Sequence, residues 1–397
     1  MYSDLLKMSS DRCLRNLLFA LLLIYLGQGI LYKSGSLISQ ASLFIYLSIS
    51  AYYGFKHVKQ KERNLFGNLM LVFLVINLVY WMFSPQIIAG HKSFVNLKNN
   101  VFFILTFYPF YFMSKKEVLT TRSLQVFLIL IFSVYTAQYF LKAEFVMGTL
   151  GRDNIVNNGA YYFVSILPLM AIFFRNKLMY FLLYLISLYL VISSAKRGAI
   201  ISFALGSIIA FYFLLKDIET KNRYRNIIIV IIGLGFVIYY GYQQIIENSF
   251  VQRRFELAFE GNYSNRDIIY TDILNNWLYS GHFINVLFGY GFNGSLFLNG
   301  SFAHNDWLEV LSGQGFIGVI LYLIILFSIW KYYLSNNIFM NNEQKSIFLS
   351  TLGIWFLQSL FSSVYGGFFT FSYILCLALI MGSIDQLKEQ NYQIEDF

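Results

Sequence analysis

Apolar runs of membrane-spanning length recur along this 397-residue sequence, with short polar segments between them. A helix needs about 20 mostly apolar residues to cross the hydrocarbon core of a bilayer, where it must satisfy its own backbone hydrogen bonds. The pattern predicts an all-α integral membrane protein with about twelve transmembrane helices, forming a single polytopic membrane domain over residues 1–397. Candidate spans are 14–32, 36–55, 65–84, 99–114, 123–141, 159–174, 178–194, 198–215, 226–244, 315–333, 346–364 and 367–384, the fourth and sixth interrupted by Pro109 and Pro168.

The composition leaves too few charged residues to cover the surface of a water-soluble fold. Charged residues make up 12% and hydrophobic residues 57% of the chain, whereas soluble domains carry about 25% charged residues. The net charge of +9 indicates membrane orientation rather than nucleic-acid binding, because the basic residues cluster between apolar runs. The two cysteines, Cys13 and Cys376, lie in or beside apolar segments and predict neither a disulfide framework nor a zinc site.

The basic residues also predict which side of the membrane each segment faces. With the N-terminus in the cytoplasm, nineteen of the 29 Lys and Arg residues fall in cytoplasmic segments, as the positive-inside rule requires. The C-terminus then lies in the cytoplasm too, and the long connection 245–314, between the ninth and tenth spans, lies outside. Basic residues are disfavoured there, so those that remain outside need a reason: Lys33, Lys92, Lys98, Lys142, Arg152, Lys196, Arg197, Arg253, Arg254 and Arg266.

The first candidate site is the turn 193–198, Ser-Ser-Ala-Lys-Arg-Gly, between the seventh and eighth spans. Lys196 and Arg197 fall at the outer membrane boundary, where long basic side chains commonly extend towards lipid headgroups. The alternative is a phosphate clamp, because a guanidinium group matches phosphate oxygens with two parallel hydrogen bonds. Gly198 would leave room for such a ligand to approach the backbone.

The second candidate is Arg266, early in the outer connection. An ordinary ion pair with Asp267 or Asp272 would explain it, and binding of an anionic substrate would explain it equally well. Arg254 and Arg152 are further outer arginines that we assign to substrate binding. For Arg152, a local ion pair with Asp153 or simple loop polarity is at least as good an explanation.

The third candidate is His304, followed by Asn305 and Asp306. Asp306 with Glu309 three residues later resembles a helix start with reciprocal capping, which would place His304 before a helix N-terminus suited to anions. Histidine titrates near neutrality and can accept a proton from an attacking hydroxyl group. The alternative is a histidine held structurally in a loop.

Neither a metal nor a nucleotide is predicted at these positions. One histidine with Asp306 and Glu309 is a small ligand set for a metal ion. The Gly289-x-Gly291 turn follows no strand and opens no helix pattern, so it does not indicate a nucleotide-binding loop. We therefore expect no cofactor and assign Gly291 only to substrate binding.

Together these residues resemble the O-antigen ligase and O-antigen polymerase superfamily, best over residues 190–335. A departure is Lys196, where the family usually has serine before the Arg-Gly pair. The features that carry the resemblance are, in chain order, Arg197-Gly198 opening a span, Arg266 in the large outer connection, Gly289-x-Gly291, and His304-Asn305 followed after nine residues by Gly315-x-x-Gly318.

The resemblance implies a GT-C-like multi-helix glycosyltransferase in the bacterial cytoplasmic (inner) membrane, with its active site facing the periplasm. The donor would be a glycan on undecaprenyl diphosphate, and transfer would invert the anomeric centre without a metal. His304, Arg266 and Arg197 would be catalytic, while Lys196, Arg152, Asn305, Arg254 and Gly291 would bind substrate. A chain-length regulator is expected as a partner from the family alone.

Several functions remain open at this stage. A polymerase of O antigen or capsule would add the growing glycan to the next lipid-linked repeat unit, and we favour it. A ligase would transfer the glycan to lipid A-core instead. A flippase would place ionisable residues within spans near the midplane, whereas these spans are almost free of charge. A non-catalytic scaffold gives no reason for basic residues to gather outside.

Overall fold

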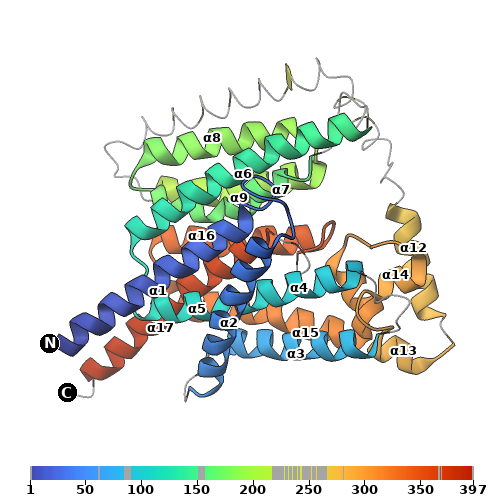
Figure 1. The fold of residues 1–397 in the computed structure, drawn as a ribbon, viewed down its shortest axis with the longest axis horizontal. Helices are drawn as coiled ribbons and strands as arrows, with labels where there is room; N and C mark the ends of the chain where they lie inside the picture. Colours follow the sequence, from blue (N-terminus) through green and yellow to red (C-terminus); the bar gives the residue numbers. More distant parts are fainter. Residues whose placement is uncertain are drawn as a thin grey trace.

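The computed structural model describes residues 2–60, 63–84, 91–150, 157–216, 266–279, 281–364, 367 and 369–395, with isolated positions between 228 and 256. The described parts are helical, apart from one isolated bridge between Gln28 and Tyr32. The longer helices form a bundle, with both termini at one end and the short helices α12, α13 and α14 at the other (Figure 1). The elements are α1 (Tyr2–Leu26), α2 (Leu37–Val58), α3 (Leu65–Phe83), α4 (His91–Leu105), α5 (Phe107–Lys115), α6 (Thr121–Leu150), α7 (Ala160–Ile166), η1 (Pro168–Phe173), α8 (Lys177–Ser193), α9 (Arg197–Lys216), α12 (Arg266–Leu278), α13 (Phe283–Phe288), α14 (Gly294–Asn299), α15 (Asp306–Asn336), η2 (Asn337–Phe339), α16 (Asn342–Ser359) and α17 (Phe371–Glu395).

Five of the described helical segments are long and apolar enough to cross a membrane. They are Leu65–Phe83, Thr121–Leu141, Arg197–Lys216, Asp306–Phe339 and Phe371–Asn391. The helical membrane character expected from the sequence is therefore confirmed. The expected ninth span, 226–244, lies almost entirely outside the described residues.

The centre of the bundle is the packing of α5 against α17. In α17, consecutive residues from Phe371 to Met381 are buried nearly all round the helix, as expected of a helix with neighbours on every side. Polar side chains join this core through backbone acceptors. Tyr108 donates to the Gly67 carbonyl at 2.7 Å and Ser114 to the Leu379 carbonyl at 2.6 Å, so no polar group of these two is left without a partner.

The two proline-containing spans are interrupted in different ways. α4 ends at Leu105 and α5 begins at Phe107, so the break precedes Pro109, which lies in the first turn of α5 where its missing N–H is harmless. At Pro168 the helix changes directly into the 3₁₀ helix η1. Both interrupted segments are buried against neighbouring helices.

α15 is the longest described helix and carries a kink at Gly315, whose φ is +67°. A β-carbon there would lie 2.3 Å from the Leu287 carbonyl oxygen, so only glycine fits. The loop between α13 and α14 packs along this kink through backbone hydrogen bonds, including Gly291 N–H to the Gly313 carbonyl at 2.9 Å. The glycines thus dock the short helices onto α15.

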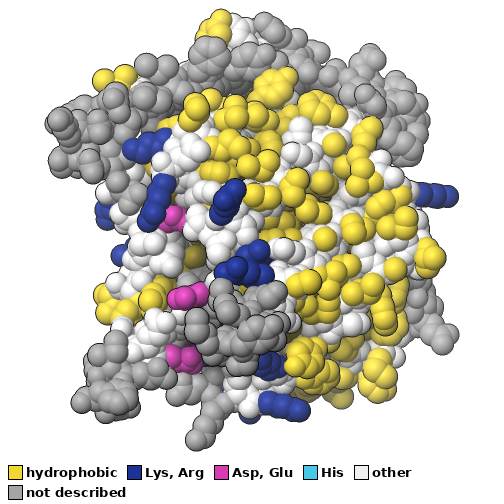
Figure 2. Space-filling model, turned by 60° about the vertical axis from the view of Figure 1, so that its left-hand side comes forward, with side chains coloured by type: hydrophobic (Ala, Val, Ile, Leu, Met, Phe, Trp, Pro, Cys, Tyr) yellow, Lys and Arg dark blue, Asp and Glu magenta, His cyan; other side chains and the backbone are white. Residues whose placement is uncertain are grey.

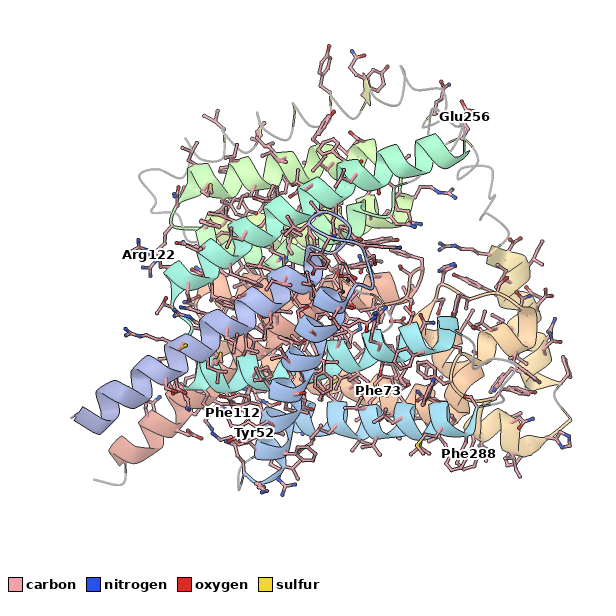
Figure 3. The ribbon with its side chains drawn as sticks, viewed as in Figure 1. Tyr52, Phe73, Phe112, Arg122, Glu256 and Phe288 are labelled. Atoms are coloured by element: carbon pink, nitrogen blue, oxygen red, sulfur yellow. The ribbon has the colours of Figure 1, made fainter. Side chains whose placement is uncertain are left out.

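The two ends of the bundle differ in what they expose. Arg122 lies near the end that holds the termini, and Phe288 lies at the opposite end, on α13 (Figure 3). We call these the terminal end and the loop end. A view turned towards the terminal end shows Lys and Arg with some acidic side chains beside a broad hydrophobic surface (Figure 2).

Candidate functional site

His304 lies at the loop end, immediately before the first residue of α15. Its side chain is exposed and its backbone is left-handed, with φ at +52°, a conformation that non-glycine residues adopt at a cost of about 1–3 kcal/mol. Asn305 is the N-cap of α15, and its side chain accepts from the Leu308 N–H at 3.1 Å. The expected helix start is confirmed, but Asp306 is not the cap.

Asp306 is instead used to hold a second chain segment beside His304. One carboxylate oxygen accepts from the Val364 N–H at 2.9 Å and the other from the Tyr322 hydroxyl at 2.8 Å. The Asn305 amide donates to the Leu360 carbonyl at 2.7 Å. These bonds fix residues 360–364, the turn after α16, against the start of α15, and we call this segment the 360–364 turn.

Glu309 supports the loop from the inside. Its buried carboxyl group accepts from the Ser295 hydroxyl at 2.5 Å and from the Ala303 N–H at 2.6 Å. The His304 backbone also hydrogen-bonds to it. The reciprocal contact expected between Glu309 and Asp306 is wrong, because the glutamate reaches back past the cap to the loop and to α14.

Arg266 begins α12 and reaches across to the 360–364 turn. Its guanidinium group donates to the Phe361 carbonyl at 2.7 Å. Among the described residues it forms no salt bridge with Asp267 or Asp272, and Asp272 accepts instead from the Asn299 amide at 3.0 Å. The local ion pair considered from the sequence is therefore absent from this part of the chain, and Arg266 keeps its positive charge beside the loop.

The turn between α8 and α9 reaches the same place from the opposite side. Ala195 takes a left-handed conformation with φ at +52°, which confirms the tight turn expected there. The Lys196 ammonium group lies 5.8 Å from the centre of the Tyr161 ring. A β-carbon on Gly198 would lie 2.6 Å from the Tyr161 hydroxyl and 2.8 Å from the Phe361 ring. Glycine here lets these two side chains approach the backbone, where the sequence suggested room for a ligand.

Charge interactions connect these residues into one group. The pKa of His304 lies below its usual value because surrounding protein removes part of its solvent, and because Arg266 and Lys196 repel the protonated ring. Tyr161 is buried and lies close enough to Arg266 for their charges to interact. We call Tyr161, Lys196, Arg266 and His304 the rim cluster, in which a neutral imidazole faces two cations.

The other residues assigned from the sequence have different positions. Arg197 is the first residue of α9, half-exposed and adjacent to Lys196 in the chain. Gly291 lies against Ser84, where a β-carbon would be 2.6 Å from the hydroxyl oxygen, so packing accounts for this glycine. Arg152 and Arg254 lie outside the described residues.

Sequence reasoning missed two members of this site. Tyr161 is one of 31 tyrosines in an aromatic-rich chain, and the 360–364 turn read as the end of an ordinary apolar span. The turn carries no charged residue, and it contributes backbone carbonyls at Leu360 and Phe361. Because the turn contributes backbone atoms, the identities of its side chains do not indicate that it belongs to the site.

In the described part of the chain, no group of three or more His, Cys, Asp or Glu side chains is arranged to hold a metal ion. The polar groups at the loop end suit an anion with hydroxyl groups beside it, because two cations and a neutral imidazole are presented together. No family model matches this sequence. No curated protein matches it either.

Proposed function

We propose that this protein is a glycosyltransferase that uses a glycan on undecaprenyl diphosphate as donor, and specifically a polymerase of O antigen or capsular polysaccharide. The observation that carries the proposal is the rim cluster, which combines Lys196, Arg266 and a neutral His304 at one end of an apolar helix bundle. A lipid-linked diphosphate needs cations at the membrane surface, and a sugar acceptor needs a group that takes its proton.

The chemistry follows from the positions of the charges. The acceptor hydroxyl attacks the anomeric carbon, forming the new glycosidic bond while the bond to the diphosphate oxygen breaks. The neutral imidazole of His304 takes the hydroxyl proton, and the diphosphate leaves with the bonding electron pair. Lys196 and Arg266 stabilise the negative charge that develops on it, with Arg197 as a third cation from the same turn.

A low pKa suits His304 for this role. Partial burial lowers the pKa most, Arg266 and Lys196 lower it further, and a lowered pKa favours the unprotonated imidazole that must act as a base. The two cations are the same groups that bind the leaving diphosphate. Binding of the anionic donor therefore partly neutralises them, raises the proton affinity of His304, and strengthens the base when substrate is present.

The finer features of the expected fold belong to this proposal. We propose about twelve spans in a GT-C-like arrangement, with both termini in the cytoplasm of a bacterial cell and the loop end facing the periplasm. Residues 245–314 would then supply part of the active site from the outer side, including Arg254, with Arg152 in another outer segment. Donor and acceptor would both be lipid-linked oligosaccharides, and a chain-length regulator would act with the enzyme.

The polymerase and the ligase differ in the acceptor, and their deletion phenotypes differ accordingly. Loss of a polymerase leaves single repeat units on the acceptor, whereas loss of a ligase leaves long polymer on the lipid carrier. Gel analysis of surface glycan and lipid-linked glycan in a deletion strain distinguishes them. Complementation with His304→Ala should give no long glycan while the protein stays in the membrane.

The matched control is His282→Ala, because His282 lies in the same loop-end region, at the N-cap of α13. We expect the control to restore the normal ladder. A normal ladder from both His304→Ala and Arg266→Ala would contradict the catalytic role of the rim cluster. Long polymer on the lipid carrier in the deletion strain would instead identify the ligase, and loss of surface glycan with lipid-linked repeat units trapped on the cytoplasmic side would identify the flippase.

A further inference from the structure

A groove on the bundle surface at the terminal end is independent of the rim cluster. It has a volume of about 410 Å³ and lies between α9, α15 and α16. This volume is within the range of about 300–1,000 Å³ in which proteins bind small molecules. The helices α9 and α16 that form its walls are the same two helices whose opposite ends reach the rim cluster.

The lining of the groove changes from apolar to basic along its length. Ile208, Phe213 and Leu349 line the apolar part, and Ile208 is 67% exposed. Lys216 is the last residue of α9, and Lys345 lies in the first turn of α16. An apolar wall that leads to a cationic end is complementary to an acyl chain attached to an anionic headgroup.

The lining of the basic end carries positive charge, although Glu343 also lies in the first turn of α16. The residues lining the groove include both lysines but no aspartate or glutamate. Tyr333, also in the lining, lies close enough to Lys216 for their charges to interact. The first turn of α16 adds the positive end of a helix dipole beside Lys345.

A neighbouring polar pocket at the terminal end has a different charge pattern. That pocket, of about 480 Å³, is lined by Asp385 and Glu389 as well as by basic residues. Glu389 forms a salt bridge with Lys115. Asp385 accepts from Tyr111 and Tyr332, at 2.7 Å each. The two carboxylates make this pocket a poorer site for an anion than the groove between α9, α15 and α16.

We infer that the groove between α9, α15 and α16 binds one anionic diacylglycerophospholipid from the leaflet at the terminal end. The phosphate lies between Lys216 and Lys345, and an acyl chain lies along Ile208 and Leu349 towards the middle of the membrane. Basic pockets between membrane helices are a recurrent means of holding anionic headgroups. The lipid bridges α9 and α16 where the chain supplies two like charges, so it relieves their repulsion and stabilises the helix pair.

The test uses the full chain purified in a neutral detergent. Phosphatidylglycerol with long acyl chains should raise the midpoint of thermal unfolding in a saturable way, and native mass spectrometry should show a retained lipid. The Lys216→Gln/Lys345→Gln double variant should weaken the apparent affinity roughly 25-fold, about fivefold for each lysine. Lys331→Gln is the matched control, because this exposed lysine of α15 does not line the groove, and its affinity should be unchanged.

Two probes separate the parts of the ligand. Glycerol phosphate carries the headgroup charge without chains, and phosphatidylcholine carries the chains without net negative charge. Protection by phosphatidylglycerol alone, lost in the double variant, supports the inference. Equal protection by glycerol phosphate overturns it in favour of a simple anion site. Equal protection by phosphatidylcholine, or full protection of the double variant, also overturns it.

Discussion

Two groups of basic residues at opposite ends of the helix bundle have different partners. At the terminal end, Lys115 forms a salt bridge with Glu389, and Lys116 forms one with Asp11 at 2.8 Å. At the loop end, Arg266 donates to a backbone carbonyl at 2.7 Å. A cation whose protein partner is neutral retains most of its field, so it remains able to bind an anion from outside.

The carboxylates of the loop end explain how this arrangement is kept. Asp306 and Glu309 both lie in the first turn of α15, beside His304, and each is occupied by N–H and hydroxyl donors. Burial among such donors fixes the backbone around His304 without placing a counter-ion in the rim cluster. Arg266 at the loop end therefore has a neutral bonding partner, whereas carboxylates neutralise Lys115 and Lys116 at the terminal end.

The largest expected effect is the loss of transfer when Arg266 is replaced by alanine. Removing one group that stabilises charge in a transition state reduces the rate by about 10²–10³-fold, or about 2.7–4 kcal/mol. We expect this loss in an assay of purified protein with lipid-linked repeat units. Arg266→Lys keeps the charge but not the planar fork, so it should recover part of the rate.

The same substitution also tests the comparison between the two ends. Lys115→Ala at the terminal end removes a similarly half-buried cation from a salt bridge. Transfer should stay within about a factor of two of the parent rate, because this pair lies far from the rim cluster. If Arg266→Ala and Lys115→Ala reduced the transfer rate equally, the positive charge at the loop end would have no specific role in transfer.

The second effect concerns the kink that docks the short helices. Gly315→Ala places a methyl group 2.3 Å from the Leu287 carbonyl in a backbone with φ at +67°, and the conformation alone costs about 1–3 kcal/mol. We expect a lower unfolding midpoint in detergent and a lower yield from the membrane. The matched control is Gly353→Ala in α16, where the nearest atom to a β-carbon is the end of a flexible side chain at 3.2 Å. If Gly315→Ala unfolds no earlier than Gly353→Ala, the kink does not depend on glycine.

The sequence predicts the membrane fold better than it predicts the site. Apolar length alone identifies the helical spans, because the bilayer demands both the length and the apolar character. The sequence predicted Arg266, Lys196 and His304 as site residues because charged and titratable side chains are rare in such an apolar chain. It did not predict the 360–364 turn or Tyr161, since a backbone carbonyl and one aromatic residue among many form no distinguishing pattern. Asp306 was assigned to the wrong partner because Val364 is 58 residues away, and no local rule reports contacts at that separation.

The third effect concerns the carboxylate that joins the start of α15 to the 360–364 turn. Asp306→Ala leaves the buried Val364 N–H and Tyr322 hydroxyl without their acceptor, and each orphaned group costs about 1–3 kcal/mol. We expect lower stability together with a lower transfer rate, because the turn also holds Arg266. Asp306→Asn keeps one acceptor oxygen but puts an NH2 donor in place of the other, so it satisfies only one of the two donors and should fall between. A parent-like rate in Asp306→Ala would show that the turn keeps its place without this carboxylate.

The fourth and smallest effect is a shift in pH dependence. His304 must be neutral to act as a base, so activity falls as the pH drops through its pKa, which partial burial, Arg266 and Lys196 hold below the usual value. Lys196→Gln removes one of the repelling charges, so the pKa of His304 should rise and the acid limb of the rate profile should move to higher pH.

Raised salt should move the parent profile in the same direction, because it screens the exposed charges, and should move the Lys196→Gln profile less. An acid limb that Lys196→Gln leaves in place, or moves to lower pH, would mean that a group other than His304 titrates, and the contrast between the two ends would then rest on Arg266 alone.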